Sequence, residues 1–157
     1  MKIAGGIAAL LASMAVAVGI ASPAAADVTD DTVGTYTMTL GGNPTTWTVT
    51  PCEADPTRKP FIPCVHVADG GGEFLPWQAD AHFSVGFWSL SVERPDAITC
   101  DDGSTLPATV RYWWNPVSLE GRLGFFFTGG CGGVEAQSLN TPFILIRNGA
   151  PPAPPEV

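Results

Sequence analysis

Basic residues are scarce in this 157-residue chain, which carries 7 Lys and Arg against 15 Asp and Glu and has a formal net charge of −8. A nucleic-acid-binding protein needs a basic surface that neutralises phosphates, and this composition has the opposite sign. The same negative charge disfavours attraction to an anionic lipid surface. We therefore expect no nucleic-acid partner.

Motifs for enzymatic chemistry are also lacking. The chain has no G-x-S-x-G nucleophile elbow, and its glycine-rich segment 69–73 lacks the lysine and the helix of a phosphate-binding loop. There are two histidines, His66 and His82, and spacing places no third metal ligand beside them. We predict no catalytic residue, no metal site and no cofactor. A catalytic site that the fold alone assembles stays an alternative.

One long uncharged stretch is present, at residues 3–20, directly after a positively charged start. Small residues at Ala24 and Ala26 then form an A-x-A cleavage site. We predict that residues 1–26 are a signal peptide and that the secreted chain begins at Asp27. A retained membrane anchor is the alternative, but the stretch is near the lower length limit for a spanning helix. No second apolar stretch of that length follows, so we expect a secreted protein without stable membrane insertion.

All four cysteines, Cys52, Cys64, Cys100 and Cys131, lie after the predicted cleavage site. An even number in an exported chain favours two disulfides, whereas a four-thiolate zinc site typically has two close cysteine pairs. If the strands that flank the Pro-rich loop pair antiparallel, Cys52 and Cys64 stand at its neck. Cys100 and Cys131 then share the open end of a later hairpin. We predict the disulfides Cys52–Cys64 and Cys100–Cys131.

Helix-forming patterns are rare, while alternation of polar and apolar residues recurs along the chain. Residues 35–40 and 46–50 each place threonines on one side and apolar side chains on the other, and glycine-rich turn residues separate them. Further strands are predicted at 65–67, 82–85, 88–92, 110–114, 119–128 and 143–146. The strand at 143–146 is apolar on both faces and is expected to be central or covered.

About eight short strands joined by tight turns predict an all-β fold, an antiparallel meander that forms a small barrel or a sandwich. The predicted organisation is a signal peptide at 1–26, one secreted β domain at 27–149 and a proline-rich flexible tail at 150–157. A domain of this size buries about two-thirds of the surface of its unfolded chain, which is enough for a hydrophobic core.

The content of aromatic side chains is the most unusual feature of the sequence. The neighbours Trp113 and Trp114 must point to opposite faces of one strand, and the run 125–127 of three phenylalanines alternates in the same way. An aromatic covering of the outside would explain the rings that face away from the core. The functional alternative is an exposed or cavity-lining patch that binds a ligand or a partner. Five candidate ligand-binding residues follow from this: Trp88, Trp113, Trp114, Phe125 and Phe127.

Several of these features occur together in a recognisable order. The A-x-A signal sequence, Gly34-Thr35-Tyr36, the run TWTVTPC at 46–52 and Cys100-Asp101-Asp102-Gly103 before a Trp-rich strand resemble small secreted actinobacterial, especially mycobacterial, proteins of unknown function. Relative to them, the segment 53–63 is an insertion. The resemblance implies export and a structural role for the cysteines, and it carries over no catalytic residue.

We therefore expect a secreted, non-enzymatic protein that binds a hydrophobic small molecule or lipid. One alternative is a protein–protein interaction module at the envelope or host interface, and another is a hydrolase whose site is not legible in the sequence. A cavity lined by Trp and Phe would favour the small molecule. A filled core with a flat aromatic surface would favour a protein partner, and a cleft joining a histidine to a carboxylate and a hydroxyl would favour the hydrolase.

Overall fold

The computed structural model describes residues 28–53, 57, 62–72, 75–127, 129–132 and 137–149. The predicted signal peptide at 1–26 and the predicted tail at 150–157 lie outside these residues and stay predictions. In the part of the chain that the structure describes, no helix is long and apolar enough to cross a membrane.

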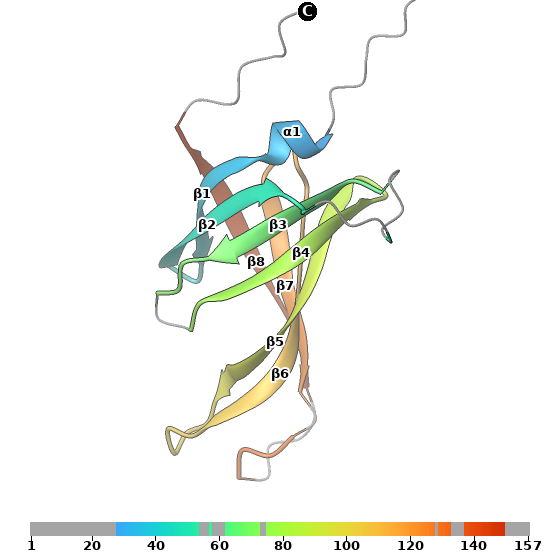
Figure 1. Ribbon diagram of the computed structural model, residues 1–157. Helices are drawn as coiled ribbons and strands as arrows, with labels where there is room; N and C mark the ends of the chain where they lie inside the picture. Colours follow the sequence, from blue (N-terminus) through green and yellow to red (C-terminus); the bar gives the residue numbers. More distant parts are fainter. Residues whose placement is uncertain are drawn as a thin grey trace, which may run out of the picture.

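Eight antiparallel strands form a closed barrel in which each strand pairs with its neighbours in the chain and the last strand pairs with the first (Figure 1). The elements are α1 (Val28–Thr32), β1 (Gly34–Leu40), β2 (Asn43–Pro51), β3 (Cys64–Asp69), β4 (Trp77–Ser84), β5 (Phe87–Thr99), β6 (Thr105–Trp114), β7 (Glu120–Phe127) and β8 (Gln137–Asn148). The predicted all-β antiparallel meander is confirmed, and it closes as a barrel rather than a sandwich.

The alternation of β1 and β2 decides which side chains enter the barrel. Tyr36 and Trp47 are directly opposite in the ladder, and both are buried. Thr37 and Thr46, the next pair, point outward, because successive residues of a strand face opposite sides. The connection is a tight turn at Gly41-Gly42, where φ is 58° and 91°. Positive φ at both central residues is the geometry of the hairpin turn that glycine favours.

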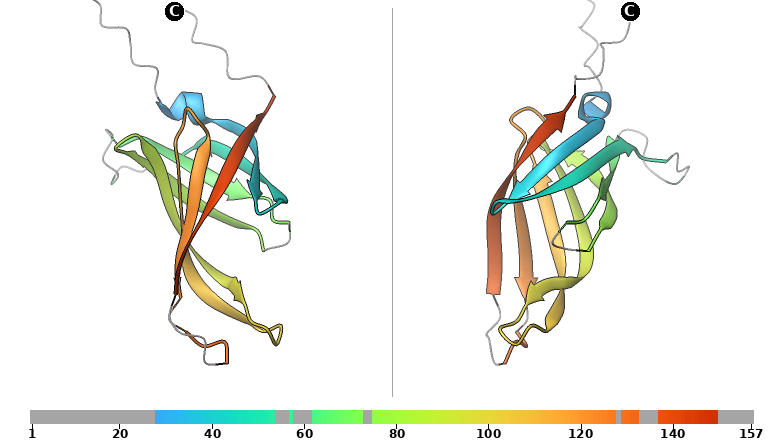
Figure 2. Two further views of the ribbon diagram at one scale, coloured as in Figure 1. Left: turned by 180° about the vertical axis from the view of Figure 1, so that it is seen from behind. Right: turned by 90° about the vertical axis from the view of Figure 1, so that its left-hand side faces the viewer.

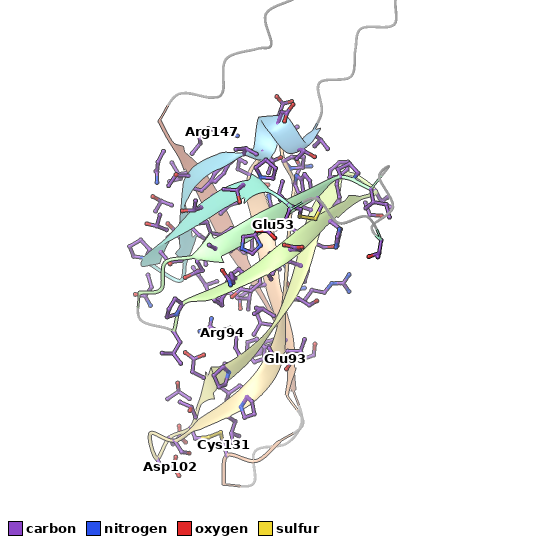
Figure 3. The ribbon with its side chains drawn as sticks, viewed as in Figure 1. Glu53, Glu93, Arg94, Asp102, Cys131 and Arg147 are labelled. Atoms are coloured by element: carbon purple, nitrogen blue, oxygen red, sulfur yellow. A yellow bond between two sulfur atoms is a disulfide. The ribbon has the colours of Figure 1, made fainter. Side chains whose placement is uncertain are left out.

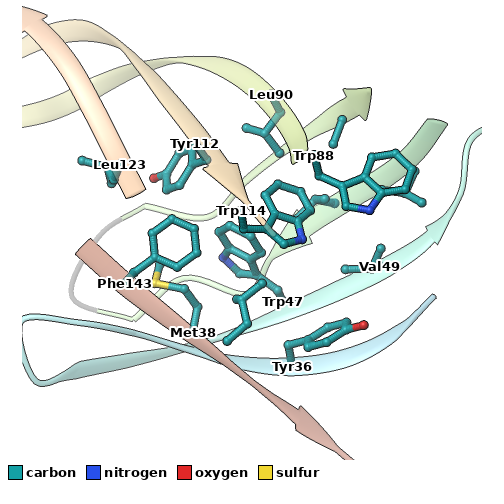
Figure 4. Close-up of a cluster of buried hydrophobic side chains, with 14 of the residues drawn as sticks. Tyr36, Met38, Trp47, Val49, Trp88, Leu90, Tyr112, Trp114, Leu123 and Phe143 are labelled. Atoms are coloured by element: carbon teal, nitrogen blue, oxygen red, sulfur yellow. The ribbon is translucent and has the colours of Figure 1, made fainter. Parts of the chain in front are cut away.

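Aromatic side chains fill the inside of the barrel (Figure 4). The largest fully buried side chains are Trp47, Trp88, Trp114, Tyr36 and Tyr112. The Trp47 ring lies at the centre, with ring centroids 5.6 Å from Trp114 and 5.5 Å from Tyr112. An eight-stranded barrel is just wide enough for side chains to fill it, and here large rings occupy that space.

The short helix α1 was not expected, because five residues are too few to show a helical period. It lies at one end of the barrel (Figure 1). The Trp88 Nε1 donates to Thr32 Oγ1 at 2.9 Å, and the Tyr36 hydroxyl donates to the Thr32 carbonyl at 2.7 Å. Two core aromatics therefore use α1 to satisfy their polar atoms.

Strands β5, β6 and β8 are longer than the others, and β5 to β8 continue past the ends of β1 to β4 as an arm (Figure 1 and Figure 2). The ladder between β5 and β6 is irregular between Arg94 and Ile98. Arg94 lies near the point where the arm leaves the barrel, and Asp102 and Cys131 lie near its tip (Figure 3).

Both predicted disulfides are confirmed. The Cα atoms of Cys52 and Cys64 are 5.6 Å apart, and those of Cys100 and Cys131 are 5.3 Å apart. The Cys52 N–H donates to the Cys64 carbonyl at 3.5 Å, as expected at the neck of a loop between the antiparallel strands β2 and β3. Two disulfides are compatible with an oxidising, extracellular environment.

Two details of the predicted strands are wrong. Strand β8 was expected to be central or covered; it does lie between β7 and β1, but its outer face is not covered, since Phe143 and Leu145 are buried while Ile144 and Ile146 are 53% and 57% exposed. Residues 143–146 are all apolar, so the sequence pattern could not show that no other layer covers Ile144 and Ile146. Strand β4 begins earlier than predicted, at Trp77, and Val85 belongs to the following turn rather than to the strand.

Candidate functional site

The structure separates the five aromatic candidates. Trp88 and Trp114 are 0% and 1% exposed and belong to the filled core. Phe125 is half-buried and packs against that core. The side chain of Phe127 lies outside the described residues. Trp113 is half-buried and lies on the opposite face of β6 from Trp114. Of the candidates whose side chains the structure describes, it is the one that faces outward.

The Trp113 ring lies across the outside of β7. A Cβ atom placed on Gly124 would be 3.1 Å from two carbons of this ring. Trp113 is directly opposite Ser89 on β5 and Arg122 on β7. The ring therefore occupies the space that the absent side chain of Gly124 leaves open, and it is held against the sheet rather than extended into solvent.

Two shallow depressions adjoin this ring and share two aromatic side chains, Phe87 and Trp113. One depression is about 410 Å³ and reaches Arg111 and Ser89. The other is about 360 Å³ and reaches Arg122. Phe87 is 45% exposed. We call this surface the outer aromatic patch and define it by Phe87, Arg111, Trp113 and Arg122.

The turn beside the patch holds a strained residue. Val85 and Gly86 connect β4 to β5 with φ values of 52° and 85°. Positive φ at both central positions defines a turn that strongly prefers Asn-Gly, and a β-branched residue there is an outlier. Val85 is nevertheless 94% exposed, so packing does not explain it. Backbone strain of this kind clusters at functional sites.

The arginines of the described chain fall into two groups. Arg94 contacts Asp96 at 3.1 Å, and Arg147 donates to the Val33 carbonyl at 2.9 Å and lies over the Tyr36 ring. Arg111 and Arg122 are exposed and lie on the patch. Arg122 donates a hydrogen bond to the Asn140 side chain at 3.2 Å. Because an amide is uncharged, this contact does not neutralise the guanidinium. Positive charge thus borders the aromatic rings.

The end of the barrel opposite α1 contains a polar cluster. Asp69 is buried, and its carboxylate accepts from Trp47 Nε1 at 2.8 Å and from Thr45 Oγ1 at 3.0 Å. The buried guanidinium of Arg94 pairs with Asp96. Burial raises the pKa of the Tyr112 hydroxyl, although Arg94 opposes this effect.

This cluster is structural. Within the described chain, no buried side-chain nitrogen or oxygen lacks a hydrogen-bond partner. The cavity beside Asp69 and Arg94 is about 30 Å³. That volume accommodates water but not an organic ligand.

The structure brings His66 to a carboxylate. Its Nδ1 lies 2.8 Å from Asp80 Oδ1, and Thr50 is its partner on the neighbouring strand. The side chains of His66 and Asp80 are 35% and 37% exposed, so the pair is on the open outer face. Among the described residues, Thr50 makes no side-chain hydrogen bond to His66.

Sequence reasoning missed Phe87, Arg111 and Arg122 as members of the patch. The alternation along β6 does place Arg111 and Trp113 on the face opposite Tyr112 and Trp114, so part of the signal was present. Arg122 and Phe87 join them through cross-strand register, which a single sequence does not reveal. No protein-family model matches this chain, and no curated protein or solved structure is significantly similar to it.

Proposed function

We propose that this protein is an exported, non-enzymatic binding module that docks a partner protein on the outer aromatic patch. The observation that carries the proposal is the division of the tryptophans. Trp47, Trp88 and Trp114 fill the barrel, whereas Trp113 lies on its outside beside Phe87. A filled core with an aromatic surface fits a protein partner better than a small molecule enclosed by the barrel.

The composition of the patch supports a protein partner. Trp and Arg are among the residues that dominate binding energy at protein interfaces, and aromatic residues are enriched there. Trp113 and Phe87 provide two aromatic anchors, and the half-buried Trp113 ring is held against β7 by the space at Gly124. A pre-positioned anchor loses less side-chain entropy on binding. The exposed Val85 adds apolar surface beside them.

Charge identifies the kind of partner. The chain has a net charge of −8, and yet two arginines adjoin Trp113 on this one face, Arg111 two positions earlier on β6 and Arg122 opposite on β7, whereas Glu120 is the one acidic residue that lines the two depressions. An acidic partner would be repelled by most of the protein and attracted to the patch. We therefore propose that the partner presents an apolar side chain flanked by carboxylates.

The predicted export fits the same function, because a folded, disulfide-containing module outside the cell meets other proteins there. The predicted signal peptide at 1–26 and the two disulfides support this location.

The proposal can be tested by site-specific photo-crosslinking. A photoreactive amino acid is placed at Ser89, in the larger depression, or at Thr48, an exposed position on β2, and the mature protein is applied to envelopes of the producing cells. We expect a covalent protein adduct from Ser89 and none from Thr48. The adduct should be lost in Trp113→Ala and in Arg111→Glu/Arg122→Glu, and it should weaken as salt rises.

Near-UV circular dichroism of each variant checks that the tryptophan core is intact. Equal adducts from both positions, or an adduct that survives both substitutions, would contradict docking at the patch. Native mass spectrometry of the purified protein is the second arm. A co-purified small molecule that is lost in Trp113→Ala would show that the patch binds a ligand rather than a protein.

A further inference from the structure

The outer face of β2, β3 and β4 gathers a second group of side chains that the outer aromatic patch does not include. In the ladder between β3 and β4, Cys64 is opposite His82, and His66 is opposite Asp80. The disulfide joins Cys64 to Cys52, just after β2. Both histidines of the chain therefore lie beside one disulfide.

The sulfur atoms are close to a carboxylate. The Sγ atoms of Cys52 and Cys64 and one carboxylate oxygen of Asp80 all lie within 4.8 Å of one another. His66 Nδ1 is 2.8 Å from Asp80 Oδ1. A histidine that binds the carboxylate in this way fixes its orientation, as outer partners do at metal sites.

We propose that reduction of the Cys52–Cys64 disulfide creates a zinc site made of Cys52, Cys64, Asp80 and His82. Two thiolates, a carboxylate and an imidazole are ligands that Zn²⁺ accepts in tetrahedral geometry. In that geometry two thiolate sulfurs are about 3.8 Å apart, a distance that the separated sulfurs of neighbouring cysteines can reach. His66 is a positioning residue that holds Asp80.

The chemical balance of the proposal is simple. The S–S bond breaks as it takes up two electrons and two protons, either from two thiols, which become a disulfide, or from a phosphine and water, which become a phosphine oxide. Zn²⁺ then replaces both thiol protons, which are released to solvent. The site exists in the reduced chain, as it is before oxidation or after contact with a reducing thiol, and it is lost when the disulfide forms.

The second disulfide must be separated from this effect. In Cys100→Ser/Cys131→Ser, the remaining thiols after reduction belong to Cys52 and Cys64. The matched control is Cys52→Ser/Cys64→Ser. Each mature variant is reduced with a phosphine and titrated with Zn²⁺ against a chromophoric chelator. Co²⁺ is then used as a spectroscopic probe of thiolate ligation.

We expect one Zn²⁺ per reduced Cys100→Ser/Cys131→Ser chain, with a thiolate-to-cobalt charge-transfer band. We expect no such binding by its oxidised form or by the control. His82→Ala and Asp80→Asn in the same background should bind Zn²⁺ at least tenfold more weakly. His66→Ala should weaken binding by about 10–100-fold, the range for residues that orient a ligand.

Absence of Zn²⁺ binding by the reduced variant, or equal binding by the control, would overturn the site. If the reduced variant unfolds, circular dichroism is recorded before and after Zn²⁺ is added. Because metal binding is then coupled to folding, Zn²⁺ should restore the barrel, and failure to do so would also overturn the proposal.

Discussion

The indole N–H of Trp88 donates a hydrogen bond to Thr32 Oγ1 at 2.9 Å, and this contact fixes α1 to the barrel core. Thr32→Val keeps the shape of the side chain but leaves the buried Trp88 N–H without its acceptor. We expect the free energy of unfolding to fall by about 1–3 kcal/mol. Urea denaturation measures the change. Thr48→Val, at an exposed position of β2, is the control and should change stability by less than about 0.5 kcal/mol.

Two glycines of β7 should respond differently to the same substitution. A Cβ on Gly121 would lie 2.3 Å from Phe143 Cζ, inside the core, so Gly121→Ala should lower the unfolding free energy by roughly 1–3 kcal/mol. A Cβ on Gly124 would meet the outer Trp113 ring at 3.1 Å. Gly124→Ala should therefore displace that ring, reducing the crosslink at Ser89 while stability changes little. Equal loss of stability in both variants would contradict this division.

The strained turn between β4 and β5 offers a substitution that should separate stability from binding. Val85 has φ of 52°, a conformation that asparagine adopts at lower cost. Val85→Asn should raise the unfolding free energy by about 1 kcal/mol, the order of the cost of this conformation for a residue with a Cβ. It should weaken partner capture, because an exposed apolar side chain is lost. Gly86→Ala, with φ of 85°, should instead lower stability.

The two disulfides close loops of different length, with sequence separations of 12 and 31. On the chain-entropy model each stabilises the fold by roughly 3–4 kcal/mol, and the longer loop contributes more. Cys100→Ser/Cys131→Ser should therefore lower the Tm more than Cys52→Ser/Cys64→Ser. Calorimetry under non-reducing conditions measures this, and peptide mapping should recover the untouched bridge in each variant. A larger Tm loss from the shorter loop would contradict the entropic account.

Asp96 links stability to pH. Burial raises the pKa of its carboxyl, but the Leu75 backbone N–H and the Arg94 guanidinium lower it more, so the pKa is below the ordinary value. A lowered pKa in the folded state means stabilisation that is present above about pH 4 and is lost as the pH falls through the folded pKa. Asp96→Asn should be less stable at pH 7, and its stability should fall less steeply on acidification.

Much of the fold could be predicted because the chain alternates cleanly. The threonine rows of β1 and β2 and the glycine turn between them specify a hairpin without help from the rest of the molecule. The same local logic placed Cys52 and Cys64 at one loop neck. It failed for Val28–Thr32, which is helical through its contacts with Trp88 and Tyr36 rather than through its own pattern.

The candidate site was less predictable than the fold. Two adjacent tryptophans guarantee that one ring leaves the core, and the sequence indicates that it is Trp113 only through Arg111, which lies on the same face of the strand. The answer depends on which face of β6 meets Trp47, which is set by pairing between distant strands. The burial of Ile144 and Ile146 was equally hard to predict. Apolar residues on the exposed outer face give the same sequence pattern as a strand that is buried on both faces.

Closure of the barrel joins the two ends of the chain. Thr37 on β1 donates a hydrogen bond to Asn148 on β8, 111 positions later, whereas every other strand pairing joins consecutive strands. During synthesis, β1 therefore has one unpaired edge until β8, near the end of the barrel sequence, has been made. Exposed strand edges invite pairing with other chains. The protein is thus most prone to aggregate before β8 has paired. If the earlier hairpins have formed by then, the growing sheet has two exposed edges, one at β1 and one at the last strand added.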